Sequence, residues 1–498
     1  MSRTGNKGLA LAPDVVRAVL KGHSSLGLAF AAVLYLVCLT GALAVFVAEF
    51  TRWENPAAPR VATLAPDALP QAYAEALAKA GGPVDRILMV LPKPENPLLR
   101  VRTEAQGAGQ REWFADRAGH LAAPVREGWT ELLVRLHVNL HLPRAWGGFL
   151  VGLAGVALLS SLISGILAHP RIFRDAFQLR LGGSRRLQEA DLHNRIGVWA
   201  LPFHLIVSLT GALLGLSTVI IAVLGMVAFQ GNTARVYALF RTPRVATDTR
   251  PAPPLDLRPM LADAARRVPT GRIDYLRIEH PARRDGSVEL QVEDGSHRIA
   301  GTDAYGYDRQ GRLYHAKRAA ENNLGGQILG SLGPLHFGWF AGPMVKIAYG
   351  LLGFGLAYLA SGGVLLWIAR RRDRGRPVPG WERIWVAFAW GQPLALAAGA
   401  LGAVAAPAMV LVPLLAWAST SLAMLAVAAA MAARPLARFG RGGTGLVLTL
   451  IAMVHGGWRS ADAMVAAVNL VLLAVGAALM FSATRPANAP LTGGVNAG

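Results

Sequence analysis

The chain contains a single cysteine, Cys38, among its 498 residues. One thiol excludes disulfide bonds within the chain, and it also excludes the multi-cysteine ligand sets of iron–sulfur clusters and thiolate zinc sites. Covalent c-type haem attachment, which needs a Cys-x-x-Cys-His motif, is excluded for the same reason. Any metal or cofactor held by this chain must therefore rely on other side chains.

Charged residues are also scarce, at 16%, whereas hydrophobic residues make up 53%. Together with long apolar runs, this composition predicts a multi-pass membrane protein rather than a soluble domain. The net charge of +20 does not indicate a nucleic-acid partner, because the arginines flank hydrophobic helices, as in cytoplasmic loops under the positive-inside rule. The clusters are Arg171, Arg174, Arg180, Arg185 and Arg186, then Arg370–Arg376, then Arg434, Arg438 and Arg441.

Two further functional classes lack their usual residues. No glycine-rich fingerprint accompanies a strand–helix–strand unit, so the chain is not expected to bind NAD(P)H or flavin. Proton-coupled transport usually needs acidic residues inside the membrane, and the four C-terminal helices offer no acid suited to that role apart from Asp462, near a loop. Transport is therefore the weakest of the functions we considered.

One apolar stretch, Asp191–Ser217, organises the rest of the chain, and it is long enough to cross a bilayer. His193 stands at its entrance, with Gly197 four residues later and Thr210-Gly211 at seventeen and eighteen. The first hydrophobic helix has the same spacing, from His23 to Gly27 and then to Thr40-Gly41. The chain therefore contains a duplicated unit, and a histidine marks the start of each copy.

Each copy is predicted to be a helix, a polar α+β module and a second helix. We expect the following divisions: 1–50, a basic N-terminal segment with helix 1 (about Ser24–Phe50); 51–142, the first module; 143–229, helices 2 and 3 with a basic loop; 230–337, the second module; 338–376, helix 4 with a basic end; and 377–498, four additional helices near 384–404, 407–432, 444–458 and 464–482. Eight membrane helices with both termini in the cytoplasm follow from this division.

The two polar modules have the same predicted order of elements. In the first, a helix over Asp67–Lys79 precedes strands at Val84–Leu91, Leu98–Thr103, Arg111–Ala115 and His120–Val125. In the second, a helix over Leu255–Val268 precedes strands at Arg272–His280, Ser287–Glu293, Thr302–Asp308 and Arg312–Ala316. Topology places both modules on the outer side of the membrane.

Four histidines occupy matched positions in the two copies. His23 and His193 lie at the inner entrances of helices 1 and 3, and His137 and His336 lie before helices 2 and 4 on the outer side. Depth therefore pairs His23 with His193 and His137 with His336. Neutral imidazoles from two helices are the usual axial ligands of b-type haem, so we expect two haem b groups forming an electron path across the membrane.

Two other histidines are less certain ligands. His141 lies one turn after His137, but the spacing to the glycine of the following helix favours His137 as the partner of His336. His204 follows His193 by eleven residues, which on a straight helix places it on nearly the same face and deeper in the membrane. It either ligates a haem or hydrogen-bonds a propionate or a neighbouring helix. The alternative for every histidine is an interfacial polar residue without a ligand role.

Several segments resemble the PepSY-associated transmembrane family of bacterial inner-membrane proteins. The resemblance lies in LKGHSSLGL with TGAL, LLVRLHVNLHLP with SGIL, DLHNRIGVWALPFH with TGAL, and PLHFGWFAGP, and it covers roughly residues 15–375. FADRAGHLAAPV and YGYDRQGRLYHA resemble the closing hairpins of PepSY domains. The implied fold is a mainly α membrane protein of about eight transmembrane helices with two small PepSY-like α+β modules in the periplasm, between helices 1 and 2 and helices 3 and 4.

The resemblance also implies a function. Relatives include reductases that release iron from ferric siderophores, and they carry bis-histidine haem in the membrane. His23, His137, His193 and His336 match the family histidines, whereas His141 and His204 are weaker matches. The expectation is a haem-dependent ferric reductase of the bacterial inner membrane, whose partners are a ferric siderophore or other ferric chelate, membrane lipid, and a quinol or a cytoplasmic reductase as electron donor. Its further catalytic residues are not identified.

The alternative is a protein of another class. A non-redox PepSY membrane protein would sense a ligand or restrain a peptidase through the same modules, and it would need no haem. Haem content therefore separates the two hypotheses.

Overall fold

The structure is a computed structural model that describes residues 12–168, 185–239, 241–296 and 298–485. The part of the basic cluster from Arg171 to Arg180 lies outside these ranges. The chain forms two compact units: Met1–Glu127 with Val134–Gly363, and Gly128–Leu133 with Val364–Gly498. The four matched histidines all belong to the first unit.

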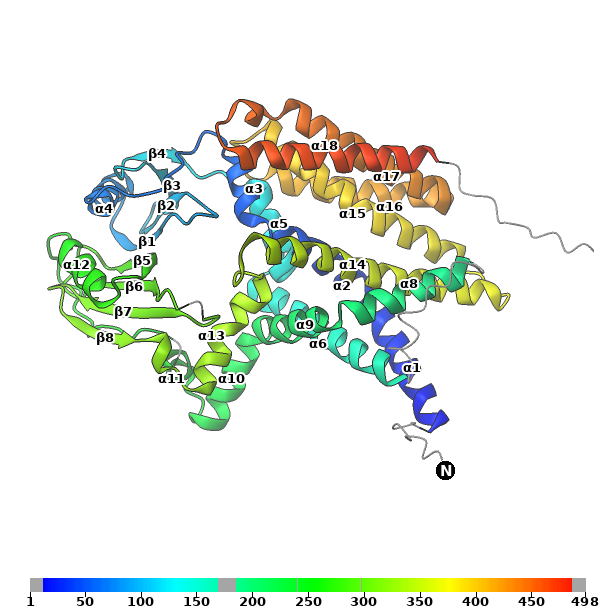
Figure 1. The fold of residues 1–498 in the computed structure, drawn as a ribbon, viewed down its shortest axis with the longest axis horizontal. Coiled ribbons are helices and arrows are strands. Elements are labelled where there is room, and N and C mark those ends of the chain that lie inside the picture. Colours follow the sequence, from blue (N-terminus) through cyan, green and yellow to red (C-terminus); the bar gives the residue numbers. More distant parts are fainter. Residues whose placement is uncertain (1–11, 169–184, 240, 297, 486–498) are drawn as a thin grey trace, which may run out of the picture. The chain divides into compact units, whose positions relative to one another are not determined.

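An antiparallel eight-stranded sheet forms the polar part of the first unit, with strand order β4-β3-β2-β1-β5-β6-β7-β8. Helices α4 (Ala68–Lys79) and α12 (Arg258–Arg267) bury their apolar sides against it around a shared core. The strands are β1 Val84–Val90, β2 Leu99–Ala105, β3 Gly109–Ala115, β4 Leu121–Pro124, β5 Arg272–Glu279, β6 Ser287–Glu293, β7 Thr302–Asp308 and β8 Leu313–Lys317. Both modules thus contribute to one sheet (Figure 1).

The two modules join through β1 and β5, which pair antiparallel at the centre of the sheet. When Asp85 is aligned with Asp274, Leu88 and Arg277 occupy the same position in the two copies, and they pair with each other. An approximate two-fold axis that passes between these two residues therefore relates β1 to β5. The sequence predicts two small modules, and the structure adds that they share a backbone ladder.

Alternation of apolar and polar residues explains why these strands were recognisable from the sequence. In β6, Val288, Leu290 and Val292 are buried and the residues between them are not, so one face is covered by helices and the other is polar. The predicted bounds of β6 and β7 equal the observed ones, and those of the other strands differ by one or two residues. Helix α12 begins three residues later than predicted, at Arg258 followed by Pro259.

The helices of the first unit follow the same duplicated order. They are α1 Pro13–Ala29, α2 Ala31–Ala44, α3 Val47–Glu54, α5 Gly128–Asn139, α6 Arg144–Ala168, α8 Arg185–Trp199, α9 Leu201–Gly215, α10 Ser217–Ala228, α11 Thr233–Ala238, α13 Leu324–Phe337 and α14 Gly342–Asp373. Helix α5 begins in the second unit and continues into the first. Helices α1 and α9 both pack against α6, and α13 packs against α9.

Helices 1 and 3 were predicted as continuous spans, and the structure breaks both of them. Helices α1 and α2 meet at 67° around Phe30, and α8 and α9 meet at 71° around Ala200. Phe30 and Ala200 each follow the matched histidine by seven residues, so the break is part of the duplicated unit. Pro202, in the first turn of α9, lacks an amide hydrogen and favours a new helix start there; no comparable residue explains the break at Phe30.

Within the described parts of the chain, length and composition identify five helices able to cross a membrane, or seven if each bent pair counts as one span. The protein is therefore a multi-pass membrane protein, with fewer clear spans than the eight expected. The difference lies in α17 (Ala433–Val454), which the sequence predicted as a helix from 444. It begins eleven residues earlier and carries Arg434, Arg438 and Arg441, so it does not qualify as an apolar span.

The second unit contains α15 (Pro379–Ala405), α16 (Val412–Ala430), α17 and α18 (Ala463–Thr484), together with the start of α5 and the end of α14 from Val364. Trp129 of α5 is buried there, and its indole nitrogen donates to the Leu396 carbonyl at 2.9 Å. Leu132 and Leu133 are buried as well. The start of α5 is therefore part of the apolar interior of this unit.

Candidate functional site

The structure brings His137 and His336 together, although 199 residues separate them in sequence. Their ring centres lie 6.0 Å apart and the ring planes differ by 23°. His137 is near the end of α5 and His336 near the end of α13, and each of these helices closely follows the last strand of its module. The pair therefore lies where the two sheet modules lead into the membrane helices.

Hydrogen bonds determine which nitrogen of each ring carries the hydrogen. The Nδ1 atom of His137 lies 2.9 Å from the Val37 carbonyl oxygen, which only accepts, so Nδ1 carries the hydrogen. The Nδ1 atom of His336 lies 3.0 Å from Thr210 Oγ1. That hydroxyl donates to the Ile206 carbonyl at 2.6 Å, so it accepts from His336. In both neutral rings Nε2 therefore keeps its lone pair, which is the form that binds metals.

The partners of the two rings occupy equivalent places in the two copies. Val37 follows His23 by fourteen residues, and Val207, whose backbone also interacts with His336, follows His193 by fourteen. Gly41 and Gly211 lie directly against the rings: a Cβ atom would come within 2.7 Å of His137 at Gly41 and 2.9 Å of His336 at Gly211. No side chain larger than hydrogen fits at either glycine without displacing the histidine.

His23 and His193 also lie in matching surroundings. The Nδ1 atom of His23 donates to the Ser161 carbonyl at 2.9 Å and lies 3.3 Å from Ser164 Oγ, next to Gly165 of α6. The ring of His193 lies beside Gly362 and Gly363 of α14, the segment that matches Ser164-Gly165 in the other copy. Each inner histidine thus faces a small-residue segment of the second helix in its own copy.

His141 and His204 are placed differently. His141 lies in the break after α5, with a left-handed φ of 56°, and it is not brought into ring contact with His336 as His137 is. His204 is fully buried in α9, and neither ring nitrogen forms a hydrogen bond, although the Gly197 backbone lies near the ring. The bend at Ala200 separates His204 from His193, so the predicted common helix face does not exist.

The distance between the ring centres of the outer pair equals the distance expected for two ligands on opposite sides of one metal ion. Imidazole nitrogens bind metals at about 2 Å, and with about 1 Å more to each ring centre, two opposite ligands have centres about 6 Å apart. Among the described residues, no group of three or more His, Cys, Asp or Glu side chains could hold a metal. His137 and His336 are therefore two ligand candidates that would need further ligands from a cofactor, and a haem would be such a cofactor.

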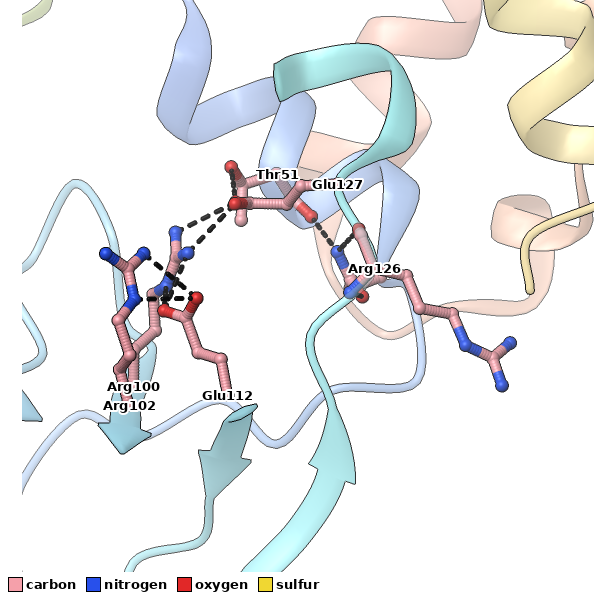
Figure 2. A network of polar contacts seen from close by, with 7 residues as sticks. Thr51, Arg100, Arg102, Glu112, Arg126 and Glu127 are labelled. Carbon is pink, nitrogen blue, oxygen red and sulfur yellow. Dashed lines mark hydrogen bonds and ion pairs between the residues drawn. The ribbon is translucent and has the colours of Figure 1, made fainter. Parts of the chain in front are cut away.

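The start of α5 is fastened to the sheet module by a polar network (Figure 2). Arg100 of β2 donates to both carboxylate oxygens of Glu127, at 2.8 and 2.9 Å, and Thr51 of α3 donates to the same carboxylate. Glu112 accepts from Arg100 and Arg102, so each acid in the network has at least two donors. Because Glu127 immediately precedes α5, the network fixes the end of the helix that carries His137.

The sequence did not predict several residues that position the site. Tyr349 of α14 donates its hydroxyl to the Leu335 carbonyl at 2.8 Å, which holds the turn of α13 that carries His336. Val37 and Val207 were also missed, although their equal distance from the two inner histidines was visible in the sequence. A hydrophobic residue that contributes only its carbonyl oxygen has no side-chain signature.

Comparison with known proteins identifies the family region and one relative. The model of the PepSY-associated transmembrane region matches residues 20–370, which include all six candidate histidines and the whole sheet. An uncharacterised protein of Pseudomonas aeruginosa is 31% identical over 345 residues, which are 65% of this chain and 86% of the relative. The family match ends at residue 370 and so leaves out most of the second unit.

Proposed function

Because the chain belongs to the PepSY-associated transmembrane family, we propose that it is a two-haem electron-transfer protein of the bacterial inner membrane. It reduces a ferric siderophore or another ferric chelate in the periplasm and so releases iron during uptake. The N- and C-termini lie in the cytoplasm and the sheet modules in the periplasm. The observation that supports this proposal is the pair His137 and His336. Their ring centres lie 6.0 Å apart, and both Nδ1 atoms form hydrogen bonds.

The chain's residues prepare the outer site for a metal-bound cofactor. Val37 and Thr210 accept the Nδ1 hydrogens, which orients each ring and leaves Nε2 as the ligand atom. Gly41 and Gly211 allow the helices to approach the rings. His137 and His336 would hold a b-type haem through their Nε2 atoms, and with both side chains bound it would supply one-electron transfer. The chemistry supported is thus electron transfer rather than oxygen binding.

The inner site uses His23 and His193, one from each copy, in their matched positions beside Gly165 and Gly362. Electrons enter there from a quinol or a cytoplasmic reductase. Two sites near opposite faces of a hydrocarbon layer about 30 Å thick keep the electron path inside the protein. At the outer face, Fe(III) in the chelate accepts one electron, and Fe(II) is held more weakly by hard oxygen ligands and leaves.

Optical spectroscopy of the detergent-purified protein tests this proposal. A Soret band with sharpened α and β bands after dithionite, at about two haems per chain, is the expected result. His23→Ala and His336→Ala should each remove a different haem. A protein that stays colourless after expression with excess haem would contradict the proposal and favour the non-redox sensor or regulator.

The sensor hypothesis has one observation in its favour. The two modules form a continuous sheet whose face opposite α4 and α12 is lined by charged side chains, including Arg86, Arg102 and Glu289. Such a surface suits recognition of a peptide or small ligand and needs no metal. Haem content decides between the two functions.

A further inference from the structure

A chain of aromatic rings leads from the outer histidine pair to the surface. The ring of His336 contacts Phe337 edge-on at 5.5 Å between centres, and Phe337 contacts Trp339 at 4.5 Å. Trp339 is 61% exposed, whereas Phe337 is only 37% exposed. The rings thus connect His336 with an accessible indole across only three residues of sequence.

The turn between α13 and α14 holds Trp339 in this position. Gly338 and Gly342 have φ values of 74° and 73°, the left-handed region that side chains disfavour, so the turn Gly338–Gly342 depends on glycine at both ends. The ring of Tyr349 lies about 3.0 Å from where a Cβ of Gly338 would be, and it closes the turn from the inside. Tyr349 therefore packs against this turn, whereas Trp339 in the same turn is largely exposed.

Exposed tryptophans in membrane proteins are commonly interfacial anchors. Trp146, 72% exposed in the first turn of α6, is suited to that role. Trp339 differs because its ring belongs to the contact chain that ends on His336. An anchor needs no such contact, whereas transfer of an electron to a bound molecule does need a short, packed path.

We propose that Trp339 is the contact at which the ferric chelate docks and through which it is reduced, and this inference rests on the function proposed above. The chelate class that suits it has planar aromatic, catecholate-type arms, because a flat indole face stacks on such rings. A haem held by His137 and His336 would supply the one electron that reduces Fe(III) of the chelate to Fe(II). Phe337 and Trp339 provide the path and are not themselves oxidised or reduced.

Binding is tested without redox chemistry by using the gallium(III) complex of a catecholate chelator with the full-length protein in lipid nanodiscs. We expect Trp339→Ala to weaken binding about tenfold, Trp339→Phe to weaken it less, and Trp146→Ala to change it less than twofold. Equal losses in the two alanine variants would indicate membrane anchoring and overturn the proposal. If Trp339→Ala weakens binding of the gallium complex of an aliphatic hydroxamate chelator equally, the proposal that the chelate has aromatic arms would be wrong.

Reduction is tested with the same variants after dithionite. Trp339→Ala should keep the haem content and the reduced spectrum of the wild type, and its re-oxidation by the ferric catecholate chelate should slow about tenfold. Unchanged re-oxidation would contradict the role of Trp339 in the electron path. Absence of haem from every variant and from the wild type would contradict the proposed function instead, and the gallium measurement would still decide whether Trp339 is a docking site.

Discussion

At the residue scale, two pairs of repeated glycines have different roles. Gly41 and Gly211 contact the rings of His137 and His336, whereas a Cβ at Gly27 or Gly197 would meet no atom within 4 Å. All four glycines recur at equal spacing from the inner histidines, so the sequence alone did not separate them. Spacing within one helix reveals which residues are duplicated, but contact with a ring depends on another helix that only the fold brings near.

Gly211→Ala should therefore disturb the outer site. The new Cβ would lie 2.9 Å from the His336 ring, so the ring must move away from Thr210. We expect loss of the outer haem, measured as a fall from about two haems to about one per chain in the pyridine haemochromogen assay. Gly197→Ala is the matched control and should keep both. An unchanged haem content in Gly211→Ala would contradict the packing argument.

A second residue-scale prediction concerns pH. Glu75 of α4 accepts from His120 at 2.7 Å; this contact is the main cause that lowers the pKa of Glu75 to about 2 and raises the pKa of His120. The stability from Glu75 is present above its usual value of 4.5 and is lost as pH falls toward 2. The stability from His120 is present below 6.5 and is lost as pH rises through its raised pKa.

The pair should therefore contribute most between pH 4.5 and 6.5, where both groups are charged. His120→Gln should lower the midpoint of thermal unfolding in that window, and the difference from the wild type should shrink above it. Because His120 is largely exposed, we expect a small effect. A difference that is constant from pH 4.5 to pH 9 would show that the ion pair is not its source.

At the element scale, the strands were predictable and the helix breaks were not. Alternating burial in β2 and β6 follows directly from alternating apolar residues. The breaks at Phe30 and Ala200 lie inside apolar runs, and the hydropathy of such a run is the same for a continuous helix as for a broken one. Pro202 was the one local signal, and its position at a helix start rather than inside a helix depended on the fold.

The shared sheet can be tested by cross-linking β1 to β5. Leu88 and Arg277 lie directly opposite each other in the antiparallel pair, which brings their Cβ atoms to about 5 Å. The double variant Leu88→Cys with Arg277→Cys should form a disulfide under mild oxidation, detected as faster migration on non-reducing gels. Native Cys38 lies in the apolar helix α2, away from these strands in sequence.

A register control completes this experiment. Leu88→Cys with Glu279→Cys places the thiols two residues out of register, because Glu279 pairs with Arg86. This variant should cross-link far more slowly than the first. Equal rates in both variants, or no disulfide in either, would contradict the observed junction of the two modules.

At the scale of the whole molecule, all four matched histidines lie in the first unit, but α5 is shared with the second. The buried side chains of Trp129 and Leu132 lie against Leu396 and Gly399 of the second unit. Removing residues 377–498 would expose them to solvent or lipid and destabilise the start of α5. His137, at the other end of this helix, would lose its fixed position.

A chain ending at residue 376 should therefore lose the outer haem and keep the inner one, because His23 and His193 do not lie on α5. The measurement is haem per chain in the purified, truncated protein. Retention of two haems would show that α5 folds without the second unit. The sequence left the four additional helices without a role, because Trp129 alone gives no sign of where its partner lies.

The two-fold pairing of β1 with β5 has the geometry of an isologous subunit interface, in which position i contacts j and position j contacts i. Two copies of a half-length chain would meet in this way, and the outer pair would then take one histidine from each copy. Fusion into one chain lets the halves diverge. Lys346 forms an ion pair with Glu49, whereas Val219 and the glycines at 147 and 148 occupy the corresponding places in the other copy. A symmetric dimer would carry both such bridges or neither.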